Sequence, residues 1–313
     1  MGAIGDIFSR AFGSRVASER AGAIAQETMQ PSDRQWLMDT FRRGYASDLT
    51  APVQERALSQ AFDGIDAKGL SALRQTVASL RSDAKGALVL KSVAAGEPMD
   101  QVTHYADAIR PVRESTAIAG STVRGQQDLM QQFGNSCAPA TVETAIGEAD
   151  PVYAWKLKQL GEVAKADPAK NPVLAAEQQQ WVSEEGATAV PRGATGGKSI
   201  PILYMLNRYL SPVTHASYQE IEDGSVSAAI DRMAPLLRDG YDVPVRVQFG
   251  NGTGHFMLAM AQRGDAGARD VLFHDPLTGK TEWIAERDLV KNRFPAIFGH
   301  TPTTLTHHYE AQP

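Results

Sequence analysis

Apolar residues in the first third of the chain recur at the spacing of helices. Three runs with an apolar residue at every third or fourth position cover residues 33–45, 51–62 and 67–93. Stripes of this kind usually form a core rather than a ligand site. We therefore predict a small all-α region over residues 31–110, its end loosely marked by the breakers Gly96 and Pro98.

The first 30 residues show a shorter pattern of the same period. Apolar residues follow one another at three- and four-residue spacing, with arginines between them: Ile4, Ile7, Phe8, Ala11, Phe12 and Val16. This arrangement is typical of a short amphipathic helix. We expect residues 1–30 to form such a segment, which could pack on the rest of the chain or contact a membrane surface or a partner.

In the last third of the chain the apolar period changes from helical to that of strands. After a helical run that ends on Gly240, β-compatible runs cover residues 243–249, 255–263 and 270–276. Short connections that contain glycine predict that these strands form an antiparallel meander. Helices precede the strands in this half, so we predict an α+β fold for a second domain over residues 111–313. A polar, glycine-rich stretch at 183–199 is expected to be a loop.

Composition narrows the classes of function. The 313 residues are 42% hydrophobic and 21% charged, which fits a soluble globular protein. The net charge of −5 comes from interspersed acids and bases, so there is no basic stripe, and nucleic acid is not an expected partner. A single cysteine excludes an internal disulfide and a cysteine-rich zinc site. No secretory signal peptide and no membrane-spanning apolar stretch are expected.

The single cysteine, Cys137, falls where a helix is predicted to begin. Asn135 or Ser136 can cap this helix, and Pro139 is tolerated only in a first turn. The free N–H groups and the dipole at a helix N-terminus favour the thiolate, which is the reactive form. A free cysteine is more often a small buried apolar residue. The catalytic interpretation therefore depends on the residues that accompany Cys137.

His255 and Asp275 are the residues that could act together with Cys137. His255 follows a glycine-rich turn at the start of one predicted strand, and Asp275 ends the next. Neighbouring antiparallel strands place the start of one beside the end of the other. An imidazole can then activate the thiol, and a carboxylate can orient the imidazole. Taken singly, His255 could be a strand-end histidine and Asp275 a turn residue before Pro276.

A side-chain amide completes the candidate site. Gln131 lies six positions before Cys137, and its amide can donate to the oxyanion that forms when a thiolate attacks a carbonyl. Gln132 is an alternative donor.

The order of these motifs resembles a known family. Gln131-x5-Cys137, GHF at Gly254 to Phe256 and HDPLTG at His274 to Gly279 resemble the papain-like cysteine peptidase superfamily, most closely its bacteriocin-leader-processing and related bacterial branch. The resemblance covers roughly residues 125–298. This sequence departs from the family pattern after the cysteine, where Ala138 and Pro139 stand in place of the glycine that the family often has.

The resemblance implies both a fold and an activity. Residues 111–313 would form a papain-like fold, with Cys137 as nucleophile, His255 as general base and acid, Asp275 as orienting residue and Gln131 as oxyanion donor. We expect cleavage of peptide bonds in a protein or peptide substrate, without a cofactor or metal.

Two other classes of function stay open at this point. Glutamine deamidation and transglutamination begin with the same thioester, and a papain-like fold can also serve as a non-catalytic binding module. Bacterial toxins and effectors that resemble this superfamily act on the proteins of another cell. We therefore expect a bacterial cytoplasmic protein that is exported by a dedicated secretion machine.

The remaining candidate residues are weaker. His274 adjoins Asp275 but should point to the opposite face of its strand, as a structural or surface residue. His307 and His308 form a pair in the C-terminal tail without a nearby third metal ligand. Lys198 lacks the glycine spacing of a phosphate-binding loop.

Overall fold

The computed structural model describes most of the chain outside its N-terminus. The described residues are 31–44, 51–123, 129–158, 170–192, 200–249, 254–291, 293 and 304–312. The amphipathic segment predicted over residues 1–30 lies outside them, as does Lys198.

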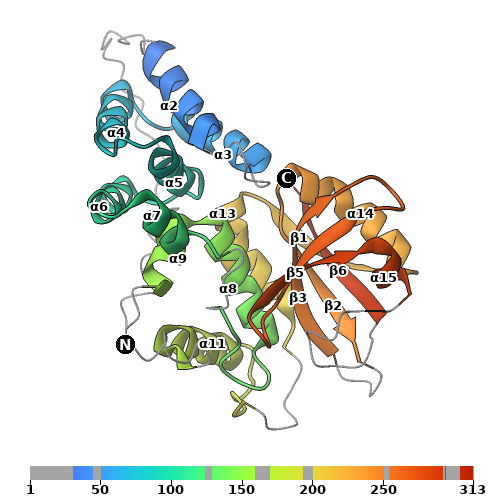
Figure 1. Ribbon diagram of the computed structural model, residues 1–313. Coiled ribbons are helices and arrows are strands. Elements are labelled where there is room, and N and C mark those ends of the chain that lie inside the picture. Colours follow the sequence, from blue (N-terminus) through green and yellow to red (C-terminus); the bar gives the residue numbers. More distant parts are fainter. Residues whose placement is uncertain are drawn as a thin grey trace, which may run out of the picture.

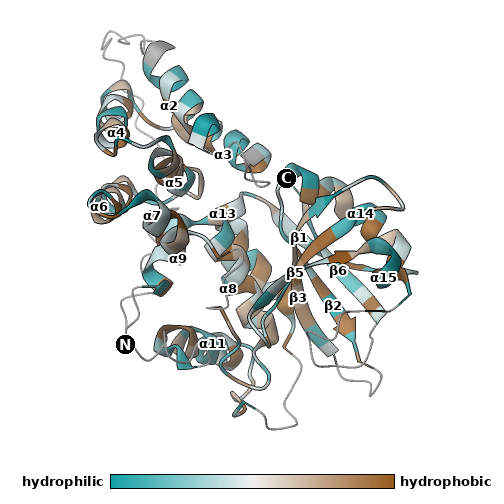
Figure 2. Ribbon diagram, in the orientation of Figure 1, coloured by the Kyte–Doolittle hydropathy of each residue, from teal (hydrophilic) through white to brown (hydrophobic). Residues whose placement is uncertain are grey.

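The N-terminal part is all-α, as the apolar spacing predicts. Its helices are α2 (Pro31–Gly44), α3 (Ala51–Asp63), α4 (Ala67–Ser79), α5 (Asp83–Ala94), α6 (Met99–Ile109) and α7 (Glu114–Ser121). They stack at one end of the molecule (Figure 1). Their apolar faces share one core, which includes Leu37, Phe41, Leu58, Phe62, Leu73 and Leu90. Teal and brown alternate around these helices in Figure 2, as expected for amphipathic helices that bury one side.

Two details differ from the sequence prediction. The run 67–93 forms two helices rather than one, because Arg81 adopts a positive φ of 53° and Ser82 caps α5 by accepting a bond from Lys85 N at 3.1 Å. The breakers Gly96 and Pro98 do not end the helical region either. They form the turn between α5 and α6, since Gly96 has a φ of 85° and Pro98 precedes the first residue of α6.

The C-terminal part contains a six-stranded antiparallel sheet. Its strands are β1 (Ser217–Glu222), β2 (Val243–Gln248), β3 (Gly254–Arg263), β4 (Asp270–Asp275), β5 (Lys280–Ala285) and β6 (Thr304–Gln312), in the order β1-β6-β2-β3-β4-β5. The predicted meander is present as β2-β3-β4. No local pattern predicted β1 or β6. β1 is mostly exposed and polar, and β6 lies between β1 and β2.

Helices cover both faces of this sheet (Figure 1). α14 (Val226–Asp239) and α15 (Glu286–Val290) pack on one face, and α8 (Cys137–Ala149) packs on the other. Side chains along β3 alternate between the two layers, as strand geometry requires: Phe256, Leu258 and Met260 join the core beneath α8, whereas Met257 and Ala259 join the core beneath α14. The fold is therefore a mixed α+β arrangement.

α8 is the central helix of the molecule. Every residue from Ala138 to Glu148 is buried, because the sheet lies on one side of the helix and further helices cover the others. These are α9 (Pro151–Lys158), α11 (Pro172–Glu184), α12 (Ile202–Met205), the π-helical turn η2 (Leu206–Leu210) and α13 (Ser211–Thr214). A helix that is buried all round is fixed by its packing rather than by an amphipathic pattern.

The helical core extends beyond the boundary predicted at residue 110. Ala117 of α7 and Val152 of α9 are buried in it, and Trp155 of α9 packs against it. α9 follows α8 directly, so the chain passes from the sheet layer into the helical core at this point. The division of the chain into residues 31–110 and 111–313 stays a prediction. Within the described ranges, every helix is too short or too polar to traverse a lipid bilayer.

Candidate active site

Cys137 is the first residue of α8, so the prediction that it opens a helix is confirmed. Ser136 occupies the N-cap position, but its hydroxyl bonds to the Phe133 carbonyl and to Gln178 instead of to the helix. Pro139 lies in the first turn, where no intrahelical N–H bond is lost. Cys137 as a residue is half-buried, and its thiol lies at the N-terminus of the helix.

His255 and Asp275 meet at the end of the sheet where β3 begins and β4 ends. His255 Nε2 lies 2.7 Å from Asp275 Oδ1, and both side chains are buried. The carboxylate also accepts bonds from Leu277 N and Thr278 Oγ1, each at 2.9 Å. Burial raises the pKa of Asp275, but these bonds and the imidazole outweigh it and lower the pKa overall. Asp275 is thus a fixed anion that holds the ring.

The imidazole also contacts the thiol. Burial raises the pKa of Cys137, but the hydrogen bond and charge of His255 and the N–H groups of Phe256 and Ala138 leave it below its ordinary value. Burial lowers the pKa of His255, but its bonds to Asp275 and Cys137 raise it to about 9. Since Nε2 is directed to Asp275, Nδ1 is the ring nitrogen left for the thiol. Both pKa shifts go in the direction that favours a thiolate–imidazolium pair over a neutral thiol and imidazole.

Phe249 is a neighbour of this pair that the sequence did not indicate. It follows β2 and stacks on the His255 ring, with centroids 5.9 Å apart and planes 23° from parallel. An aromatic face over an imidazole excludes water and restricts its rotation.

Gln131 and Gln132 point in different directions, although they are adjacent. Gln131 is buried, its Nε2 donates to the Phe133 carbonyl at 3.0 Å, and its Oε1 has no partner among the described residues. Gln132 is directed to α11, where its Oε1 accepts from Asn171 N at 2.8 Å. Of the two amides, Gln131 is the one not committed to α11.

The predicted loop at 183–199 begins only after α11, which extends to Glu184. Its described part lies against the residues before Cys137: Gly134 N donates to the Val190 carbonyl at 2.7 Å, and Asn135 Oδ1 accepts from Val190 N at 3.0 Å. Arg192 Nη2 reaches the Leu277 carbonyl beside Asp275 at 2.6 Å. This segment therefore contacts both sides of the candidate site.

Two other histidines, His274 and His308, are buried among structural partners. His274 is buried, bonds to the Leu129 carbonyl at 3.0 Å, and has a pKa lowered by burial to about 4. His308 lies in β6 and is buried, with Nδ1 2.6 Å from Asp223 Oδ2 and Nε2 2.9 Å from Glu310 Oε1, so acidic side chains that the sequence did not indicate are its partners. The described residues contain no group of three or more His, Cys, Asp or Glu side chains placed to hold a metal.

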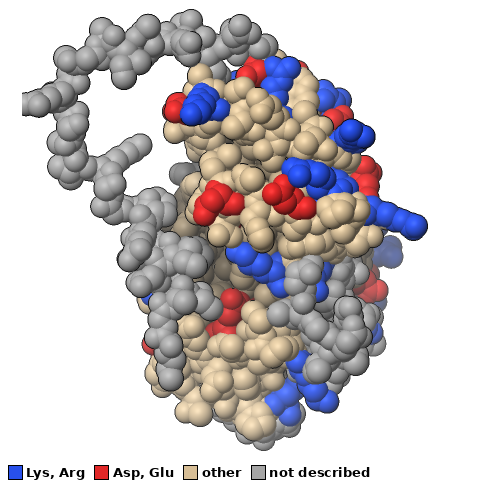
Figure 3. Space-filling view, turned by 90° about the vertical axis from the view of Figure 1, so that its left-hand side faces the viewer, with Lys and Arg blue, Asp and Glu red and all other residues tan. Residues whose placement is uncertain are grey.

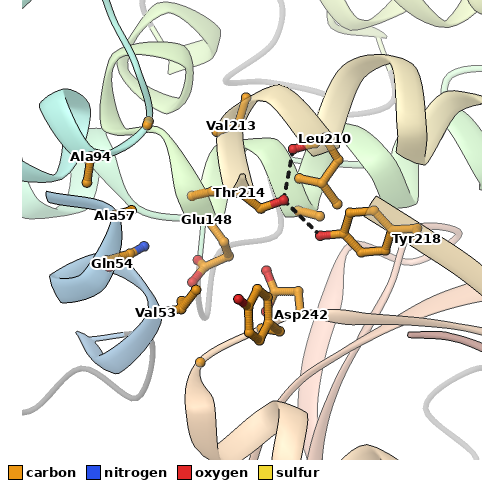
Figure 4. Close-up of a pocket in the computed structure, with 15 residues that line it drawn as sticks. Val53, Gln54, Ala57, Ala94, Glu148, Leu210, Val213, Thr214, Tyr218 and Asp242 are labelled. Atoms are coloured by element: carbon orange, nitrogen blue, oxygen red, sulfur yellow. Dashed lines mark hydrogen bonds between the residues drawn. The ribbon is translucent and has the colours of Figure 1, made fainter. Parts of the chain in front are cut away.

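A small hollow of about 30 Å³ lies elsewhere in the molecule. It separates α3 from the C-terminal end of α8, and Glu148, Thr214, Tyr218 and Asp242 surround it (Figure 4). Glu148 is eleven residues along α8 from Cys137, which corresponds to about 16 Å of helix. The hollow is therefore distinct from the candidate site.

On the face shown in Figure 3, lysines and arginines are interspersed with acidic residues, so no large patch of one charge covers it.

The chain was also compared with known proteins. No protein-family model, no curated protein and no solved structure matches it.

Proposed function

We propose that this protein is a papain-like cysteine hydrolase that cleaves peptide bonds through a thioester at Cys137. The observation that supports this most strongly is the position of His255, which bonds to Asp275 at 2.7 Å and interacts with the thiol at the N-terminus of a buried helix. Each of the three groups has its pKa moved in the direction that catalysis by a thiolate requires.

The proposed reaction has two halves. The Cys137 thiolate attacks the peptide carbonyl, and the tetrahedral intermediate collapses when the imidazolium of His255 gives its proton to the departing amine. A thioester remains on Cys137. His255, now neutral, takes a proton from water, which attacks the thioester and releases the acid product. Asp275 keeps its charge throughout and stabilises the imidazolium.

Gln131 is the proposed donor to the oxyanion. An amide nitrogen carries two hydrogens, and one of those on Gln131 Nε2 goes to the Phe133 carbonyl. The other is available for an oxygen that develops negative charge. Gln131 is anchored by its backbone as well, since its N–H donates to the Pro276 carbonyl at 2.8 Å. The same bond ties the donor to the turn that contains Asp275.

The experiment that tests the pair is alkylation of Cys137 by iodoacetamide as a function of pH, followed by mass spectrometry. In the wild type we expect rapid labelling well below the free-thiol pKa of about 8.5, because the thiolate persists beside the imidazolium. In His255→Ala the dependence should return to that of a free thiol. His104→Ala, which changes an exposed histidine on α6, is the matched control. Slow labelling in both wild type and His255→Ala would remove the basis of the proposal.

Peptide-bond cleavage is tested separately. A mixture of unfolded proteins is incubated with the wild type or with Cys137→Ala, and new peptide N-termini are identified by mass spectrometry. We expect new termini only with the wild type. Conversion of glutamine to glutamate without new termini would instead identify a deamidase.

A further inference from the structure

The side chain of Gln178, on α11, lies at the centre of the segment that precedes Cys137. It is fully buried. Its Oε1 accepts hydrogen bonds from Gln132 N and from Ser136 Oγ, each at 2.7 Å. Ser136 is the residue directly before the nucleophile, so one amide oxygen holds both ends of the segment 132–136.

The nitrogen of the same amide is equally engaged. Nε2 donates to Glu143 Oε2 at 2.7 Å and to the Met130 carbonyl at 3.3 Å. A glutamine amide offers two hydrogens and two acceptor positions, and Gln178 uses all of them. Glu143 lies in the second turn of α8, and its contact with Nε2 turns the amide oxygen of Gln178 toward the segment.

The opposite side of this segment is held by the strand that ends in Asp275. Gln131 N donates to the Pro276 carbonyl at 2.8 Å, and His274 Nε2 bonds to the Leu129 carbonyl at 3.0 Å. The segment 129–136 is thus held between α11 and the β4–β5 turn. It contains Gln131 and leads directly into Cys137, so its position sets where both groups lie relative to His255.

We propose that Gln178 is a positioning residue. It holds the segment 129–136 so that the thiol of Cys137 and the amide of Gln131 face the imidazole of His255. This inference rests on the proposed function and adds a residue to the same site. Other side chains cannot replace it fully. Methionine has a similar length but no polar group, and glutamate keeps the two acceptors and loses both donors.

The test compares Gln178→Met, Gln178→Glu and Gln179→Met, the last being an exposed glutamine on the same helix. Each protein is checked for folding by circular dichroism, and the rate of Cys137 alkylation is then measured against pH. We expect Gln178→Met to be labelled about tenfold more slowly than the wild type near pH 6, since a displacement of about 1 Å has effects of this size or larger. The midpoint of its pH profile should move up toward that of a free thiol.

The alkylation rate of Gln178→Glu should also be lower than that of the wild type, because its carboxyl group can accept from Gln132 N and Ser136 Oγ but sets an acceptor oxygen against Glu143 Oε2. Gln179→Met should match the wild type. Hydrogen exchange of the backbone amides in 130–136 gives a second measure, which should be faster in Gln178→Met. If that variant does not fold, Ser136→Ala removes one of the same bonds, and a lower rate with a raised midpoint is expected there.

The outcomes separate this inference from the proposed function. An activated wild-type thiol whose pH profile is unchanged in folded Gln178→Met, or in Ser136→Ala when that variant takes its place, overturns the positioning role alone. A wild-type thiol that titrates like a free cysteine overturns both.

Discussion

The charge of each residue in the candidate site changes the pKa of its neighbour. Asp275 stays ionised because His255, Leu277 N and Thr278 Oγ1 all bond to it. Its bond and its charge, together with those of Cys137, raise the pKa of His255 to about 9. The hydrogen bond and charge of His255 in turn lower the pKa of Cys137. The pKa of each group in this row therefore depends on the charge of its neighbour.

Asp275→Asn should lower the pKa of His255 and raise that of Cys137. Without the carboxylate, the pKa of His255 falls, less imidazolium faces the thiol, and the pKa of Cys137 rises. We expect alkylation near pH 6 to be about tenfold slower, which corresponds to about one pKa unit. Asp270→Asn, at the other end of β4, is the control. Equal rates in the wild type and Asp275→Asn would show that the carboxylate does not act on the thiol through His255.

Peptide cleavage by Cys137 and His255 should have an upper pH limit as well. His255 loses its proton as pH rises through about 9, and the neutral ring can no longer protonate a departing amine. Peptide cleavage should therefore fall above about pH 9, whereas alkylation of the thiolate should not. Both are measured on the wild type between about pH 7 and pH 10. Cleavage that continues to rise with pH would contradict the role of His255 as the acid.

At the scale of elements, the site is assembled where a helix begins, a strand begins and a strand ends. His274 joins two of these parts, because its ring lies between Thr281 of β5 and the Leu129 carbonyl before α8. Burial keeps it neutral in the folded protein and lowers its pKa to about 4. The unfolded chain binds this proton near the ordinary pKa of about 6.5. The contact is therefore weakened by acid.

Acid should destabilise the fold through His274. Between its unfolded and folded pKa values the unfolded state binds more protons, so stability is lost as pH falls. We expect the wild type to lose about 2 kcal/mol more than His274→Gln between about pH 7 and pH 5. Urea unfolding followed by tryptophan fluorescence measures this, with His104→Gln as the exposed control. Parallel pH dependence in wild type and His274→Gln would mean that other groups carry the acid sensitivity.

Across the whole molecule, the helical region and the candidate site lie at opposite ends of α8. The helical region contacts the rest of the chain at α9, α13 and α14. His215 Nε2 lies 2.9 Å from the Ala94 carbonyl, and Arg56 pairs with Asp239 at 3.7 Å. The exposed ion pair contributes little, so apolar packing around Trp155 and Val152 holds the parts together.

Gly120→Ala should loosen this packing and leave the site intact. A Cβ at Gly120 would meet the Trp155 ring, and overpacking costs about 1–3 kcal/mol. Urea unfolding should show this loss, while the rate and pH dependence of Cys137 alkylation stay unchanged. Gly224→Ala, where a Cβ meets nothing within 4 Å, is the control. A changed alkylation profile in Gly120→Ala would show that the helical region does act on the site.

The sequence by itself determined the elements whose signals are local. A cap candidate, Cys137 and Pro139 within a few residues define a helix start, and alternation with glycine-rich connections defines β2, β3 and β4. The meeting of His255 and Asp275 follows from the pairing of two consecutive strands, which a short connection enforces. These parts of the site could therefore be predicted.

Only the tertiary structure decided the contacts between distant segments. β6 enters the sheet beside β1 and β2, and Gln178 bonds to residues more than forty positions away. His308 bonds to Asp223, which lies 85 positions away and which no local pattern specifies. A buried polar group must find hydrogen-bond partners, but the sequence does not say which ones, because they are set by how the layers pack.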